Sequence, residues 1–266
     1  MIFASDLDRT LIYSNRAINI LGSSEIDNLK PVEKKGSRWV AYMTENAFSA
    51  LRELAHNSLF IPVTTRTTEQ FNRVFIFGQD IPIKYAITSN GARIIQNGRP
   101  LEEWTNYISQ NLEEQSLSPA EFLSEIKRSG LEWNGEWKQA EDLFLYSILY
   151  DVLPESLIKE ISLAAEASGW RISLQGRKLY FIPKAISKGA ALEFICKLEG
   201  QKVAAGAGDS RLDLDFLTLC KLGFVPKHGE LVKESVNTGL TVTSQTGVKA
   251  GEEIIQQFLR LIPLAI

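Results

Sequence analysis

The sequence opens with MIFASDLDRT (residues 1–10), in which a short apolar run leads into two aspartates one residue apart and a threonine. The apolar run predicts a buried strand that delivers Asp6 and Asp8 to its carboxyl end, the edge where open α/β sheets keep their ligands. Two carboxylates this close repel each other unless a cation lies between them or one takes up a proton. A hard divalent cation with oxygen ligands, above all Mg²⁺, would resolve that repulsion. Taken alone, the pattern fits a solvated acidic turn equally well, so the rest of the chain has to decide.

The composition is that of an ordinary globular protein, with 266 residues, 44% hydrophobic and 23% charged. This length has room for one large domain or two modest ones. The net charge of -3 gives no general reason to bind nucleic acid or an acidic membrane surface, although a local basic pocket for a small anion is compatible with it.

Cellular location is indicated by the cysteines and by the two ends of the sequence. Cys196 and Cys220 form neither a metal-type pair nor a disulfide framework, which favours a reducing compartment, the cytosol. No signal peptide is predicted, because Asp6 interrupts the first apolar run, and the apolar tail 258–266 is too short to cross a membrane. Nothing in the sequence indicates the oligomeric state.

Strands alternate with helices in the first third of the chain, after an irregular stretch that follows Thr10 and runs through Lys35. The expected elements are a hairpin over 32–43 turning at Gly36-Ser37, a helix over 45–57 capped by Thr44, buried strands at 59–63 and 85–88, and a helical stretch from Thr68. This alternation predicts right-handed crossovers and a parallel sheet.

The pattern changes at about residue 95. Helices are expected at 101–115, 119–129 and 154–167, a turn containing Trp and Gly through Trp137, a strand at 143–150, and a hairpin made of 170–174 and 178–182. A helix at 185–198 and a strand of small residues at 202–207 then return to the first pattern. The expected fold is therefore α/β, with a Rossmann-like parallel-sheet core from residues 1–94 and 185–266 and an inserted α+β module at 95–184.

Three further sites end predicted strands or begin helices. Thr64 follows the second strand and could donate to a phosphate oxygen, although it also fits a plain helix cap. Lys188 lies near a helix start, which suits a lysine only if it faces an anion; alone, it also fits a solvated surface residue. Asp209 and Asp213 follow the small-residue strand and would reach the same sheet edge as Asp6, although alone they also fit a surface acidic turn.

Taken together and in this order, the four motifs resemble those of the haloacid dehalogenase superfamily of phosphohydrolases. The motifs are the opening DLDRT, Thr64 in TTR (64–66), Lys188, and Gly208-Asp209 with Asp213, and they span nearly the whole chain. The insertion resembles the larger α/β (C2-type) cap of that family, and the SNGA stretch (89–92) before it is similar to members of the capped branch.

The resemblance implies a role for each residue. Asp6 would be the nucleophile that forms an aspartyl-phosphate, and Asp8 the acid and base for the leaving group and the attacking water. Mg²⁺ would be held by the Asp6 carboxylate, the Asp8 backbone carbonyl and Asp209, with Asp213 as a ligand or as a residue that orients one. Thr64 and Lys188 would bind the phosphoryl oxygens.

Three positions depart from the family's pattern, and none of them removes a group with a direct chemical role. Thr65 replaces the frequent glycine of the second motif. Arg9 stands where many relatives have glycine, and it would either add a cation near the phosphate or point to solvent; solvent is the favoured interpretation. Leu212 stands where many capped members have asparagine, which removes a polar neighbour of the metal site.

Substrate choice is expected to lie in the cap and in the 32–43 hairpin. Arg177 and Lys178, at a hairpin tip, could contact a second anionic or hydroxyl-rich group, although a solvated turn also explains them. The chain is similar to sucrose-phosphate and mannosyl-3-phosphoglycerate phosphatases, which implies a Mg²⁺-dependent hydrolase of a small phosphate monoester, a sugar phosphate or a glycosyl-phosphoglycerate. The cysteines favour a cytoplasmic location for it. A sugar phosphomutase of the phosphomannomutase type and a non-catalytic regulator that binds a phosphorylated ligand are the alternatives.

Overall fold

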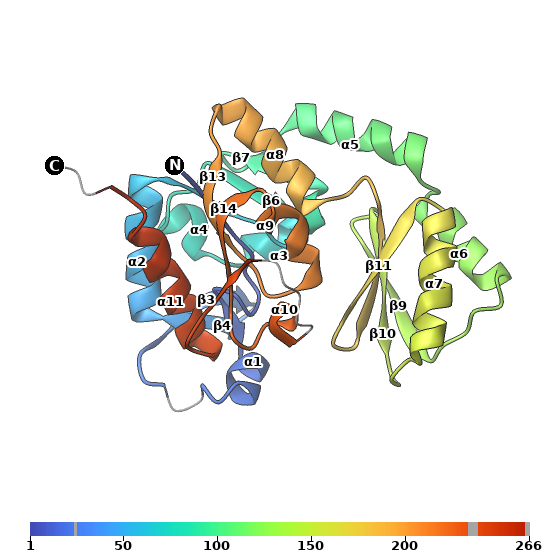
Figure 1. Cartoon of the computed structure of the whole chain (residues 1–266), viewed down its shortest axis with the longest axis horizontal. Coiled ribbons are helices and arrows are strands. Elements are labelled where there is room, and N and C mark those ends of the chain that lie inside the picture. Colours follow the sequence, from blue (N-terminus) through green and yellow to red (C-terminus); the bar gives the residue numbers. More distant parts are fainter. Residues whose placement is uncertain (24–25, 234–238, 264–266) are drawn as a thin grey trace. The chain divides into compact units, whose positions relative to one another are not determined.

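The computed structural model describes residues 1–23, 26–233 and 239–263, and the chain divides into two compact units (Figure 1). The first unit comprises Met1–Leu101 and Lys188–Ile266, and the second comprises Glu102–Ser187. The chain enters the second unit only after Leu101, and not at residue 95, because β7 (Arg93–Gln96) and β8 (Arg99–Pro100) pair with β6 (Tyr85–Thr88) in an antiparallel sheet.

The first unit is built on a parallel five-stranded sheet. Its strand order is β15 (Thr241–Val242), β14 (Cys220–Val225), β13 (Val203–Ala207), β1 (Ile2–Ser5) and β5 (Leu59–Pro62). β6 continues beside β5 through a parallel bridge between Val63 and Ile87. The predicted parallel α/β core is therefore confirmed.

Helices flank this sheet, with α2 and α11 on one side and α8 and α9 on the other (Figure 1). The helices of the first unit are α1 (Asn15–Ile20), α2 (Glu45–Asn57), α3 (Thr68–Asn72), α4 (Ile76–Gln79), α8 (Lys188–Glu199), α9 (Leu214–Leu217), α10 (Glu230–Lys233) and α11 (Gly247–Leu259). Thr44 caps α2 as expected, since its side chain accepts a 3.0 Å bond from the Ala47 N–H. The rings of Phe3 in β1 and Phe258 in α11 lie 5.2 Å apart in the core between sheet and helix.

The predicted hairpin is confirmed as β3 (Leu29–Lys35) and β4 (Arg38–Thr44), joined by a turn in which Gly36 has a φ of 60°. The stretch after Thr10 is more ordered than expected. It contains β2 (Tyr13–Ser14), which pairs with β4, and the helix α1. Elements of two and six residues are too short to show a periodic pattern of apolar side chains.

The second unit is an α+β module with an antiparallel sheet in the order β11 (Trp170–Gln175), β12 (Lys178–Pro183), β10 (Phe144–Leu149) and β9 (Gly135–Ala140). Its helices are α5 (Glu102–Gln115), α6 (Pro119–Arg128) and α7 (Glu155–Ala167). The ring of Phe122 in α6 stacks on that of Trp170 at 4.3 Å. The expected turn through Trp137 was wrong, because Trp137 lies within β9.

None of the helices within residues 1–23, 26–233 and 239–263 is long and apolar enough to span a membrane.

Candidate active site

The carboxyl ends of three neighbouring strands place the expected site residues at one edge of the first unit's sheet. Asp6 follows β1, Thr64 follows β5 and Asp209 follows β13. Backbone hydrogen bonds between neighbouring strands continue past the strand ends. The Asp6 N–H donates to the Ala207 carbonyl and the Thr64 N–H to the Ile87 carbonyl, both at 2.8 Å. The backbone that carries these side chains is therefore fixed by the sheet.

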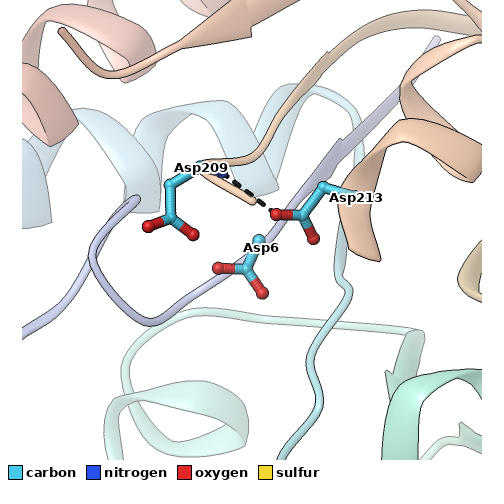
Figure 2. A group of neighbouring side chains, drawn as sticks. All are labelled: Asp6, Asp209 and Asp213. Atoms are coloured by element: carbon cyan, nitrogen blue, oxygen red, sulfur yellow. Dashed lines mark hydrogen bonds between the residues drawn. The ribbon is translucent and has the colours of Figure 1, made fainter. Parts of the chain in front are cut away.

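Asp6, Asp209 and Asp213 form a buried carboxylate cluster (Figure 2). Each offers a carboxylate oxygen, and these oxygens all lie within 4.8 Å of one another. Gly208 permits the approach of Asp213, because a Cβ at Gly208 would lie 2.4 Å from the Cβ of Asp213. These are hard oxygen donors of the type that Mg²⁺ prefers.

Lys188 is the cation buried between two members of this cluster. Its Nζ donates to Asp6 Oδ1 at 2.9 Å and to Asp213 Oδ1 at 2.6 Å, and only 1% of the side chain is exposed. Burial acts to lower the pKa of Lys188, but the charges of Asp213 and Asp6 outweigh it and raise that pKa above the ordinary value. Lys188 therefore stays charged, and the surface-lysine interpretation is excluded.

Both carboxylate oxygens of Asp213 accept hydrogen bonds from the protein itself. Its Oδ1 accepts the Lys188 bond, and its Oδ2 accepts from the N–H groups of Asp209 and Ser210 and from the Ser210 hydroxyl, at 2.9–3.0 Å. The bond from the Asp209 N–H to Asp213 Oδ2 is drawn in Figure 2. With both oxygens so engaged, the Asp213 carboxylate orients Lys188 and the 209–210 backbone.

The charged form of two carboxyl groups in the cluster is disfavoured, mainly by burial. Burial is the main cause that raises the pKa of Asp6 well above its ordinary value; nearby carboxylates add to the rise, and Lys188 opposes it. Burial, then the charge of Asp213, raises the pKa of Asp209 to about 7, against the opposing charge of Arg9. Such carboxylates regain their charged form when a cation binds, so this donor set fits a divalent ion.

Asp8 lies outside the carboxylate cluster and is held by an arginine that sequence reasoning missed. Arg66 donates from Nε to Asp8 Oδ2 at 2.6 Å and from Nη2 to Asp8 Oδ1 at 2.8 Å. Its Nη1 lies 2.9 Å from a carboxylate oxygen of Glu33 in β3, and Arg73 pairs with the other oxygen of Glu33 at 3.2 Å. The hairpin is thus tied through Glu33 and Arg66 to Asp8. Each Asp8 oxygen keeps a second lone pair for a proton.

Arg9 does not simply point to solvent, so the favoured interpretation of this departure was wrong. Its Nε lies 3.2 Å from Asp209 Oδ2, and 42% of its side chain is exposed. Its φ of 63° is in the left-handed region, which explains why glycine suits this position. The Arg9 carbonyl accepts a bond from His228 Nε2 at 2.9 Å, and burial lowers the pKa of that histidine.

Thr64 is fully buried at the end of β5. Its Oγ1 accepts a 3.1 Å bond from the Arg66 N–H, which leaves the hydroxyl hydrogen to donate elsewhere. Its carbonyl accepts from the N–H of Asn90, in the SNGA stretch. The side chain of Asn90 is buried, and neither polar atom of its amide has a hydrogen-bond partner among the described residues.

Arg177 and Lys178 lie in the second unit, at the turn between β11 and β12. Arg177 Nε donates to the Leu149 carbonyl at 2.9 Å, and Lys178 Nζ lies 5.5 Å from the centre of the Tyr146 ring. Leu212 is a buried apolar side chain of the first unit.

Comparison with known proteins finds similarity in structure alone. No protein-family model and no curated protein sequence matches this chain. The structure is similar to a sucrose-phosphatase from Synechocystis sp. PCC6803 in complex with sucrose and phosphate (16% identity, TM-score 0.69, 97% of each chain covered). It is also similar to a trehalose-6-phosphate phosphatase related protein (17% identity, TM-score 0.53, 98% of each chain covered).

A third similar structure is a haloacid dehalogenase-like hydrolase from Bacillus subtilis (14% identity, TM-score 0.58, covering 98% of this chain and 91% of the other). At identities of 14–17% these likenesses establish the fold and nothing finer. The fold of this chain, a parallel α/β core with an inserted α+β unit, is that of the haloacid dehalogenase-like hydrolases.

Proposed function

We propose that the protein is a Mg²⁺-dependent phosphatase that hydrolyses a small phosphate monoester through an aspartyl-phosphate on Asp6. The observation that carries this proposal is the fully buried Lys188, bonded to both Asp6 and Asp213 at the end of β1. A buried carboxylate with a fixed cation beside it suits a nucleophile that must attack an anionic phosphoryl group. The resemblance of the ordered motifs and of the fold supports the same reaction.

The first step transfers the phosphoryl group to the protein. A carboxylate oxygen of Asp6 attacks phosphorus, the bond from phosphorus to the leaving oxygen breaks, and Asp8 gives its proton to that oxygen. Thr64 and Lys188 hold the remaining phosphoryl oxygens. Arg66 keeps the Asp8 carboxylate oriented through its two bonds.

The second step releases phosphate. Asp8 takes a proton from a water molecule, whose oxygen attacks phosphorus and breaks the bond to Asp6. Asp6, Asp209 and the Asp8 backbone carbonyl would hold Mg²⁺, which when bound supplies positive charge to the transferring phosphoryl group. Asp213 orients Lys188 and the backbone at 209–210 throughout.

We further propose that the substrate is a sugar phosphate or a glycosyl-phosphoglycerate in the cytoplasm, selected by the second unit acting as a cap. The support is the likeness to the sucrose-phosphatase and to the trehalose-6-phosphate phosphatase related protein, both structures of nearly full coverage. The net charge of -3 favours a small ester over nucleic acid as the substrate.

The test is a panel of sugar phosphates and other phosphate esters, assayed with Mg²⁺ and with EDTA for both free phosphate and isomerised sugar. We expect free phosphate from at least one ester, and none in EDTA. Isomerised sugar phosphate without free phosphate would replace the proposal by a phosphomutase. Binding of esters without any turnover would replace it by a non-catalytic regulator.

A further inference from the structure

Arg9 is a second cation at the carboxylate cluster, and the proposed reaction gives it no task. Lys188 bonds to Asp6 and Asp213, whereas the cation bonded to Asp209 is the Arg9 guanidinium, through Nε to Oδ2 at 3.2 Å. The two sides of this pair differ in exposure: 42% of the Arg9 side chain is exposed but only 12% of the Asp209 side chain. A buried carboxylate is thus neutralised by a cation that reaches it from the solvent side.

The backbone of Arg9 is held independently of this ion pair. Its N–H donates to the Ile12 carbonyl at 2.9 Å, and its carbonyl accepts from His228 Nε2. His228 is itself held, because its Nδ1 accepts a bond from the Gly247 N–H at 3.1 Å. With the backbone fixed at a φ of 63°, the side chain can leave Asp209 without moving the loop, and glycine can replace Arg9 without backbone strain.

We propose that Arg9 is a resident counter-cation that competes with the divalent ion for Asp209. Arg9 neutralises Asp209 while the metal is absent. When the metal binds, the Arg9 side chain leaves Asp209 and extends into solvent. The proposal rests on the proposed function, since it concerns the Mg²⁺ site of that reaction. Two cations on one carboxylate repel each other, so binding of the second must weaken the hold of the first.

The exposure of the Arg9 side chain determines how strongly Arg9 should affect the affinity for the divalent ion. A long, partly exposed guanidinium forms a weak pair with a carboxylate and is released at little cost. We therefore expect Arg9 to weaken divalent binding about three- to tenfold, and the difference to shrink as salt screens the pair. If Arg9 instead oriented Asp209 for the metal, Arg9→Gly would bind the divalent ion more weakly than the wild type does.

The experiment measures Mn²⁺ binding to the substrate-free full chain by electron paramagnetic resonance, at low and at high salt, for four proteins. These are the wild type, Arg9→Gly, Arg9→Lys and Arg52→Gln, which removes one positive charge from the exposed surface of α2. We expect Arg9→Gly to bind Mn²⁺ about three- to tenfold more tightly than wild type, and the other two variants to stay within about twofold of it. Thermal unfolding checks that Arg9→Gly is folded.

Equal or weaker Mn²⁺ binding by Arg9→Gly would overturn the proposal while leaving the phosphatase proposal standing. If neither the wild type nor Arg9→Gly binds Mn²⁺, both the competition proposal and the metal site of the proposed function are overturned. If Arg9→Gly binds more tightly but no ester in the panel is hydrolysed, the competition at Asp209 stands and the phosphatase proposal fails.

Discussion

Lysine and arginine side chains lie at the carboxyl edge of the first unit's sheet and also at the β11–β12 turn of the second unit. The surroundings of these two groups differ. Lys188 is 1% exposed and bonds to two carboxylates, whereas Lys178 is exposed and lies beside the Tyr146 ring. A buried charge is tolerated only in a fixed, fully paired arrangement, while an exposed one can adapt to what it meets. We therefore expect the sheet edge to set the chemistry, and the turn to set only the preference among substrates.

Removing Lys188 should break the buried arrangement. Lys188→Met leaves Asp6 and Asp213 without their shared cation, so we expect phosphatase activity to fall about 10²- to 10³-fold and unfolding free energy to fall by about 3 kcal/mol. Steady-state kinetics and urea unfolding measure the two effects. Lys197→Met is the matched control, since Lys197 is an exposed lysine on the same helix, paired with Glu193. Equal effects in the two variants would contradict the account.

Asp209 should make the stability of the metal-free protein depend on pH. Its pKa is about 7 in the folded chain, above the ordinary value of 3.8, so the folded state binds this proton more tightly than the unfolded state does. Stability should therefore decrease as pH rises from about 4 to about 7, by on the order of 4 kcal/mol.

Unfolding in EDTA across that pH range measures this slope. We expect Asp209→Asn to reduce this slope, with the part due to the raised pKa of Asp6 remaining, and exposed Asp80→Asn to leave the slope unchanged. We also expect Mg²⁺ to restore stability at the upper end of the range. An Asp209→Asn slope equal to that of the wild type would show that Asp209 is ionised over the whole range.

Arg66 should act on turnover through its hold on Asp8. Lysine cannot make two parallel bonds to one carboxylate, so Arg66→Lys should lower kcat about tenfold with little change in KM. Arg73→Lys is the control, because Arg73 pairs with Glu33 but has no bond to Asp8 among those the structure shows. A change in KM alone would mean that Arg66 contacts substrate and does not position Asp8.

Lys178 should give the smallest effect. Lys178→Met keeps the apolar stem beside Tyr146 and removes the charge, so we expect KM for the best ester to rise about two- to fivefold with kcat unchanged. Lys159→Met, an exposed lysine of α7, is the control for a change of net charge in the same unit. A kcat loss as large as that of Lys188→Met would abolish the distinction between the two regions.

The sequence carries the parts of this molecule that depend on local patterns. Apolar runs located β1, β5 and β6, and the Thr44 cap located the start of α2, because these signals involve residues close in the chain. The order of the aspartates and Lys188 allowed the site to be inferred through a family resemblance.

The sequence does not carry the partners that meet across long separations. Arg66 reaches Asp8 and Glu33, and His228 reaches Arg9, only once the hairpin and the loop after β14 are in place. Arg9 beside Asp209 is of the same kind, since its side chain gives no local sign that it turns toward the cluster and not to solvent. Such contacts depend on tertiary geometry, for which one sequence offers no pattern.

The central claim is that Asp6 is the phosphorylated nucleophile, and rapid quench with mass spectrometry of the N-terminal peptide tests it most directly. During turnover of the best ester with Mg²⁺, we expect one phosphoryl group on Asp6 in the wild type, and neither phosphopeptide nor turnover in Asp6→Asn. Robust turnover by Asp6→Asn, or turnover by the wild type through phosphorylation of another residue, would contradict the account.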